Sequence, residues 1–256
     1  MRIFLLNAIM WKKKEVIKLK NIKAVLFDSG RVLNGPVTGH WFITPGFWKY
    51  VNKTAFDSIA KAKVASAFAE ADKYIVAQKN MTTKEEEYQH FIRFYEIFSS
   101  QLPELKLTAD AIENIARDLV FNPKKYVFYD DALSVIPELK KKYKLAIVSD
   151  AWPSLLDVYE ENNMISYFES IVISSFIGTS KPDSKMYNTA LQELNIKPEE
   201  AIFVDDSLKN CMGALAVGIN TVLLCRNKQS YITEKVKSIG KGYKVINNLN
   251  QLYKIL

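Results

Sequence analysis

The feature that most constrains the fold of this chain is a short apolar run that stops abruptly at a carboxylate. Residues 24–27 are apolar, and Asp28, Ser29 and Gly30 follow them directly. A run that is apolar on both faces suits a central parallel strand covered by helices, and ligands of such sheets bind beyond the carboxyl ends of the strands. The run therefore predicts a buried strand that carries Asp28 to a site.

The C-terminal half of the chain alternates strand-like and helix-like patterns. We expect strands over residues 145–150, 171–175, 201–206 and 221–224, and helices over residues 133–139, 186–194 and 211–217. Strands that alternate with helices indicate right-handed crossovers and a parallel sheet, so the predicted fold class is α/β. Three strands would end at Asp28, at Ser149 and at Asp205 with Asp206, which gathers polar side chains at one edge of the sheet.

Residues 47–120 instead show a helical period and no strand pattern. Thr83 and Thr108 stand where a hydroxyl can cap the first free N–H groups of a helix. Residues 34–46 are dense in turn formers and predict a loop or a short hairpin. We therefore expect an all-α cap at residues 44–127, inserted into an α/β core of residues 22–43 and 128–256.

The first 21 residues fit neither that core nor a secretion signal. Their apolar run is too short to span a membrane, and the lysines at positions 12–14 follow it, whereas a secretory signal places its positive charge first. We interpret residues 1–21 as an N-terminal extension and expect no association with a membrane.

Composition narrows the class of partner. The chain has 256 residues, of which 48% are hydrophobic, and this is ample for a core. Its 35 basic and 28 acidic residues are interspersed, so the net charge of +7 favours anionic small molecules and argues against nucleic acid. Cys211 and Cys225 form neither a metal-ligand spacing nor a disulfide framework, which indicates a reducing compartment such as the cytoplasm.

Four segments are informative together because of their order and spacing. They are residues 27–33 (FDSGRVL), 147–150 (IVSD), 178–187 (GTSKPDSKMY) and 203–214 (FVDDSLKNCMGA). With these four motifs the chain resembles the haloacid dehalogenase (HAD) superfamily of hydrolases, in the subgroup with a helical cap after the first strand. The resemblance covers roughly residues 22–225. It implies a Rossmannoid three-layer core, Mg2+ as cofactor, and phosphoryl transfer through an aspartyl-phosphate.

The chemistry of the first and fourth motifs agrees with that implication. Asp28 is the expected nucleophile, since a carboxylate that attacks phosphorus splits one hard displacement into two easier ones. Mg2+ takes hard oxygen ligands in a near-octahedral array. Asp28, the carbonyl of Gly30, and Asp206 or Asp205 can supply them, and the choice between the two adjacent aspartates stays open.

The second and third motifs would hold the phosphate. Lys181 is expected to place a positive charge against the phosphate and to order the carboxylates. Ser149 would donate a hydrogen bond to a phosphate oxygen, helped by backbone N–H groups of the turn at residues 152–154, where a helix is expected to start. We therefore predict Asp28, Ser149 and Lys181 as catalytic residues, and Ser149, Asp150 and Lys181 as substrate-binding residues.

One position departs from the family pattern. Phosphatases of the family usually carry a second Asp two residues after the nucleophile, as acid and base, and here that position is Gly30. Members similar to α-glucose-1-phosphate phosphatases share this Asp-x-Gly pattern. Substitute acids could be Asp150, His40 or Ser29. His40 has the alternative role of a loop histidine packed on aromatic rings, and His90, among the aromatic residues of the cap, is expected to be structural.

The predicted function is a Mg2+-dependent phosphatase of a small phosphorylated metabolite, such as a sugar phosphate, acting as a monomer or homodimer. A dehalogenase, in which the aspartate attacks carbon, is the first alternative, and the adjacent Asp205 and Asp206 argue against it because they suit a metal. A catalytically weak binding or regulatory protein is the second, favoured only by Gly30. The identity of the substrate cannot be predicted from this sequence.

Overall fold

The computed structural model describes residue 19 and residues 21–256 of the chain, so the predicted N-terminal extension lies almost entirely outside the described residues. A parallel sheet of six strands has the order β5-β4-β1-β6-β7-β8. The strands are β1 (Ala24–Phe27), β4 (Lys144–Ser149), β5 (Ser170–Ile173), β6 (Ala201–Asp205), β7 (Asn220–Leu224) and β8 (Tyr243–Ile246). The apolar run that precedes Asp28 thus forms a central strand, as predicted.

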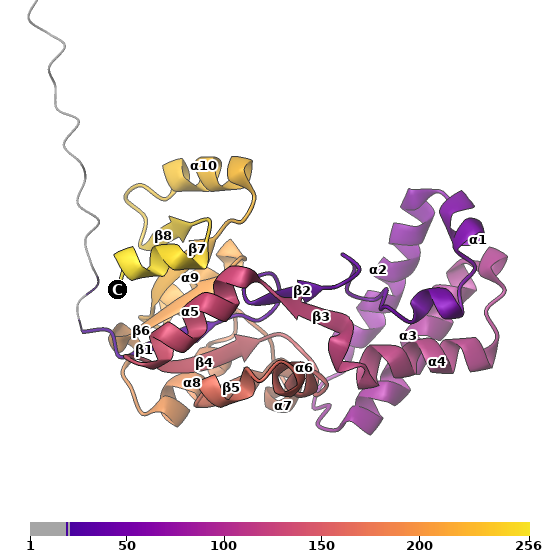
Figure 1. The fold of residues 1–256 in the computed structure, drawn as a ribbon, viewed down its shortest axis with the longest axis horizontal. Helices are drawn as coiled ribbons and strands as arrows, with labels where there is room; N and C mark the ends of the chain where they lie inside the picture. Colours follow the sequence, from indigo (N-terminus) through magenta and orange to yellow (C-terminus); the bar gives the residue numbers. More distant parts are fainter. Residues whose placement is uncertain (1–18, 20) are drawn as a thin grey trace, which may run out of the picture.

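Helices cover both faces of this sheet (Figure 1). They are α5 (Asp130–Lys140), α6 (Leu155–Glu161), α7 (Ser174–Ile177), α8 (Ser184–Leu194), α9 (Leu208–Ala216) and α10 (Lys228–Lys237). Val25 and Phe27 pack in one cluster with α5 and α6, whereas Ala24 and Leu26 pack in another with α8 and α9. Successive residues of β1 therefore face opposite layers, and the predicted three-layer α/β core is confirmed.

Strand register brings the predicted site residues to the same edge of the sheet. Phe27 lies beside Ile147 of β4 and Val204 of β6. Asp28 follows Phe27, and its N–H donates to the carbonyl of Val204 at 2.9 Å. Side chains at the carboxyl ends of β1, β4 and β6 consequently lie close to one another.

Four helices gather at one end of the molecule, away from the sheet (Figure 1). They are α1 (Lys53–Ser58), α2 (Lys61–Ala77), α3 (Lys84–Gln101) and α4 (Ala109–Phe121), and they share a core of their own that is rich in phenylalanine. Thr83 begins α3 with a reciprocal capping box that includes Glu86, and the Thr108 hydroxyl accepts from the N–H of Ala111 at the start of α4. Both predicted helix starts are confirmed.

Two short strands connect the helical cap with the core. β2 (Asn34–Pro36) and β3 (Tyr126–Phe128) pair antiparallel, so the two chain segments that enter and leave the cap run side by side. The expected loop or short hairpin at residues 34–46 is therefore partly wrong, because the partner of β2 lies about 90 residues away in the chain. The predicted boundary between residues 127 and 128 falls inside β3, and the division into domains stays a prediction.

Other elements differ from the sequence analysis in detail. The strand expected at residues 171–175 ends at Ile173, because α7 begins at Ser174. α10 and β8 were not predicted. Short 3-10 helices occur at Phe47–Lys49, Pro103–Leu105, Pro123–Lys125, Ile165–Tyr167, Pro198–Glu200 and Leu249–Lys254. Among the described residues, no helix combines the length and the apolar character needed to cross a bilayer.

Candidate active site

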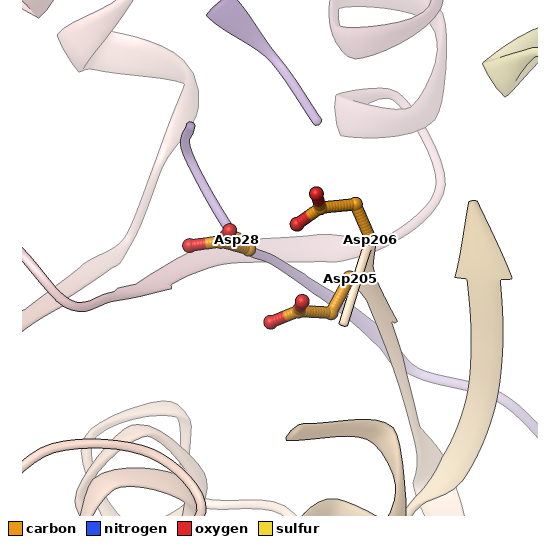
Figure 2. Close-up of side chains that lie close together, drawn as sticks. All are labelled: Asp28, Asp205 and Asp206. Carbon is orange, nitrogen blue, oxygen red and sulfur yellow. The ribbon is translucent and has the colours of Figure 1, made fainter. Parts of the chain in front are cut away.

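Three aspartates converge at the carboxyl ends of β1 and β6. One oxygen of each of Asp28, Asp205 and Asp206 lies within 4.8 Å of the others, and Figure 2 shows the three side chains beside one another. The structure therefore brings together all three carboxylates that the sequence analysis assigned to a metal.

Lys181 lies between two of these carboxylates. Its Nζ is 2.7 Å from Oδ1 of Asp28 and 2.9 Å from Oδ2 of Asp205, and its side chain is only 1% exposed. Burial alone would lower the pKa of Lys181, but the charges of Asp28 and Asp205 outweigh burial and raise it. Lys181 is thus a fixed positive charge at the floor of the site.

The two adjacent aspartates have different surroundings. Asp205 is fully buried; its Oδ2 accepts from Lys181 Nζ and from Asn210 Nδ2 at 3.1 Å, and its Oδ1 accepts from the Ser207 N–H at 2.7 Å. Asp206 is partly exposed, and Arg31 Nη1 lies 3.8 Å from its Oδ2. Burial and the nearby Asp28 raise the pKa of both carboxyls. Both oxygens of Asp205 are therefore engaged by donors, and Asp206 has more room for another ligand.

The turn that follows Asp28 is tightly hydrogen bonded. The N–H groups of Leu33 and Asn34 both donate to the carbonyl of Ser29, at 2.8 and 3.1 Å, and the Arg31 N–H donates to the carbonyl of Asn34 at 2.7 Å. No donor within residue 19 and residues 21–256 contacts the carbonyl of Gly30. That oxygen is consequently available to a cation, as the sequence analysis expected.

Gly30 lies directly beneath an indole ring. A Cβ atom at this position would lie 3.0 Å from Cη2 of Trp41, and the indole packs edge-on against Tyr126 with 5.0 Å between ring centroids. Gly30 does not have a positive φ. The close approach of Trp41, rather than backbone conformation, is therefore the physical reason for glycine where the family usually has an aspartate.

Ser149 and Asp150 lie at the end of β4, as predicted. Ser149 is 3% exposed and lines the same cavity as Asp28, whereas Asp150 accepts the backbone N–H of Lys181 at 2.9 Å. Desolvation raises the pKa of Asp150.

The turn after Asp150 leads into a helix at nearly the predicted position. The helix α6 begins at Leu155, and the Ser154 N–H donates to Glu87 of the cap at 2.8 Å. The Ala151 N–H donates to Ser174 Oγ at 3.0 Å. Protein acceptors thus bind these two amides, and the phosphate contact expected of the turn at residues 152–154 stays a prediction.

A cavity of about 530 Å³ opens above these residues, between core and cap. Asp28, Ser149, Asp150, Lys181 and Asp206 line it from the core. His40 and Trp41 from the loop before the cap, together with Phe68 and Asp72 of α2, line it from the other side. The helical insertion thus covers one side of the site.

The three candidate acids are placed differently. The Ser29 hydroxyl is hydrogen bonded to Tyr159 Oη and Asn34 Nδ2, both at 2.9 Å. His40 lines the cavity and packs on Phe68 with 4.4 Å between ring centroids, and burial lowers its pKa. His40 therefore packs on an aromatic ring and also lines the cavity, and its role as an acid stays a prediction. Burial raises the pKa of Asp150 at the cavity edge.

Other residues around the cavity could not be found from sequence motifs. His90, expected to be structural, binds Tyr74 Oη through Nδ1 at 2.9 Å inside the cap. Lys125, Trp41 and Asp72 also line the cavity, yet none belongs to a motif. The only signal for Trp41 was its position in a glycine-rich loop, and Asp72 and Lys125 have none.

Known proteins resemble this chain in both sequence and structure. The family model described as haloacid dehalogenase-like hydrolase matches residues 49–224. A protein of Methanopyrus kandleri named glyceraldehyde 3-phosphate phosphatase is 28% identical over 216 residues, which cover 81% of this chain and 85% of that protein. A protein of the same name from Methanothermobacter thermautotrophicus is 23% identical, over 92% of this chain and all of that protein.

Solved structures share the fold. The putative HAD-hydrolase YfnB of Bacillus subtilis, solved bound to magnesium, superposes with a TM-score of 0.62 at 19% identity, over 93% of this chain and 99% of that one. Because the family model covers more than half of the chain and the four motifs meet at one cavity, this protein belongs to the haloacid dehalogenase-like hydrolases.

Proposed function

We propose that this protein is a Mg2+-dependent phosphatase of a small phosphorylated metabolite and that it acts through an aspartyl-phosphate at Asp28. The observation that supports this most directly is the contact of Lys181 with Asp28 and Asp205 at the floor of a cavity that Asp206 also lines. The two relatives described above are named as phosphatases of a three-carbon phosphate. A cavity of about 530 Å³ is suited to a ligand of metabolite size.

The side chains present fit a hard divalent cation. Asp28 and Asp206 each offer carboxylate oxygens, and the Gly30 carbonyl has no donor among the described residues. Lys181 contacts only two of the three clustered carboxylates. Mg2+ prefers such oxygen ligands and usually keeps waters and phosphate oxygens as its other ligands. When bound, it would neutralise charge on the phosphate and on the carboxylates. We assign Asp28, the Gly30 carbonyl and Asp206 as ligands, with Asp205 as the residue that orients Lys181.

In the proposed reaction, Asp28, Lys181 and Ser149 each have a separate role. A carboxylate oxygen of Asp28 attacks phosphorus and forms the acyl phosphate, while the bond from phosphorus to the ester oxygen breaks. Lys181 and the Ser149 hydroxyl stabilise the charge on the phosphate oxygens. The leaving oxygen takes a proton, and a water then attacks phosphorus, restores the Asp28 carboxylate and releases phosphate.

The proton for the leaving oxygen comes from a residue other than position 30. Asp150 is better suited than His40, because its pKa is raised whereas that of His40 is lowered. Substrates whose leaving oxygen needs little protonation, such as acyl or anomeric phosphates, depend less on this step. A location in the cytoplasm and a monomeric or homodimeric state remain predictions.

The function is tested first at Asp28. Asp28→Asn is nearly isosteric and removes the nucleophile, so we expect phosphate release with Mg2+ to fall below detection while circular dichroism stays unchanged. A panel of sugar, acyl and three-carbon phosphates supplies the substrates, and 2-haloacids are assayed for halide in parallel. Full activity of the variant, or release of halide without metal, would refute the proposal.

The metal assignment is tested at the adjacent aspartates. Asp206→Asn removes a charged ligand, so we expect the Mg2+ concentration for half-maximal activity to rise by at least about tenfold, with a smaller change in substrate KM at saturating metal. Asp205→Asn is the matched comparison, and its main effect should be on kcat through Lys181. A larger shift in Mg2+ requirement for Asp205→Asn than for Asp206→Asn would reverse the assignment.

A further inference from the structure

The cap contributes polar groups to the cavity that the reaction above does not use. On α2, Phe68 and Asp72 are one turn apart and both line the cavity. His40, from the loop before the cap, packs its ring on Phe68 and lines the cavity as well. His40 and Asp72 thus line the same cavity as Asp28, Ser149 and Lys181.

His40 is held in a defined hydrogen-bonding state. Its Nδ1 accepts the backbone N–H of Phe42 at 3.2 Å, so the proton of the neutral ring is on Nε2. Burial lowers the pKa of His40, which favours that neutral ring. No acceptor within the described part of the chain contacts Nε2. His40 therefore offers one N–H donor to the cavity.

Asp72 is a half-buried carboxylate that has no hydrogen bond or ion pair with any described residue. Burial raises its pKa, and no cation lies near enough to oppose that effect. The lysines of the cavity are engaged elsewhere: Lys181 contacts Asp28 and Asp205, and Lys125 donates to Leu119 and Ser154. Asp72 therefore supplies an uncompensated acceptor at the cap side of the cavity.

We propose that His40 and Asp72 form a subsite for the leaving group of the substrate, which selects hydroxyl-bearing phosphomonoesters and rejects those whose leaving group carries a carboxylate. Hydroxyls of a substrate can accept from His40 Nε2 and donate to Asp72, which satisfies both groups. A substrate carboxylate would face Asp72 as a like charge. No cation among the described residues acts on Asp72, because Arg31, which also lines the cavity, lies beside Asp206. Such a repulsion is a common source of specificity. This inference rests on the proposed phosphatase function and adds the class of substrate.

The test uses two substrates of nearly equal size. Glycerol 3-phosphate and 3-phosphoglycerate differ by a hydroxymethyl group in place of a carboxylate. We expect kcat/KM of the native protein to be about tenfold higher for glycerol 3-phosphate, because a like charge a few ångströms away costs on the order of this factor at a half-buried site. Asp72→Asn should raise kcat/KM for 3-phosphoglycerate and bring the ratio of the two values down by about tenfold.

Two further variants separate the subsite from general charge effects. Glu70→Gln removes the same charge from the same helix, but Glu70 is exposed, pairs with Lys73 and does not line the cavity, so the ratio should not change. His40→Phe should lower kcat/KM for glycerol 3-phosphate and leave the value for 3-phosphoglycerate nearly unchanged. The inference would be overturned if the ratio of the two kcat/KM values were the same in Asp72→Asn as in the native protein. It would also be overturned if Glu70→Gln changed that ratio as much as Asp72→Asn does.

Binding to Asp28→Asn distinguishes failure of the subsite from failure of the proposed function. Calorimetric titration of this variant with either phosphate measures recognition without turnover. Tighter binding of glycerol 3-phosphate, reduced by a further Asp72→Asn change, supports the subsite even where turnover is absent. Equal binding of both ligands, or binding of neither, refutes it.

Discussion

Two buried lysines that line the cavity differ in the direction of their pKa shift. Lys181, on the floor, contacts the carboxylates of Asp28 and Asp205, and its pKa is raised. Lys125, below the cap, donates instead to the carbonyl of Leu119 and to Ser154 Oγ, both at 2.6 Å. Burial lowers the pKa of Lys125 to about 8.

The difference shows what a buried lysine needs in order to stay charged. Glu87 attracts Lys125, but its carboxylate is bound by the N–H and the hydroxyl of Ser154 rather than by the ammonium. Desolvation disfavours the charged form of any buried lysine, and direct contact with two carboxylates is enough to reverse that effect. Lys181 therefore keeps its positive charge at the floor of the cavity. Lys125, in the segment that leads out of the cap, holds its proton less tightly because no carboxylate of the described residues contacts its ammonium.

The largest effect is expected for Lys181→Met. Loss of the ammonium removes stabilisation of the phosphate and leaves Asp28 and Asp205 facing each other, so kcat should fall by at least ~10^2 to 10^3. Stability should fall by about 3–5 kcal/mol in the absence of metal, because one partner of a buried ion pair is lost. Steady-state kinetics and urea unfolding measure the two effects, and kcat within tenfold of the native value would contradict the role of Lys181.

Lys125→Met should have a smaller effect that depends on pH. Above about pH 8 the folded lysine is neutral, whereas the unfolded lysine holds its proton to about pH 10.5, so the unfolded state binds more protons in this window. Stability of the native protein should therefore rise relative to Lys125→Met as pH increases from 8 to 10.5, by up to about 3 kcal/mol.

Urea unfolding of both proteins at several pH values measures this difference. Below pH 8 the lysine is charged in both states, and the difference in unfolding free energy should be constant. A difference that stays flat to pH 10.5 would mean that Lys125 keeps its charge in the folded protein, as Lys181 does, and the comparison would fail.

The smallest effect is expected for Thr83→Ala, which removes the N-cap of α3 and loosens the turn that holds Glu87. The loss of a cap costs about 1 kcal/mol. Thr108→Ala removes the cap of α4, which does not contain Glu87, and is the matched control. Both variants should lose similar stability. Only Thr83→Ala should alter the pH dependence of the unfolding free energy that is assigned to Lys125. An equal change in both variants would show that Glu87 is not part of that effect.

Much of the core was predictable because its signals are local in the chain. The apolar run before Asp28, and those before Ser149 and Asp205, each specify a buried strand within a few residues, and parallel pairing then brings their ends together. The four motifs likewise placed Asp28, Lys181 and Asp206 at one cavity.

What the sequence by itself determined about this protein is the α/β core, the helical cap and the charged residues that line the floor of the cavity. Only the tertiary structure decided that Asp205 is the more fully engaged of the two adjacent aspartates, and that Trp41 covers Gly30. It also decided that β2 pairs with β3 and that His40 and Asp72 face one cavity. The physical reason is that these features are contacts between segments far apart in the chain. Periodicity and capping signals act over one or two turns, so they cannot specify which distant side chain will bind an oxygen or fill a space.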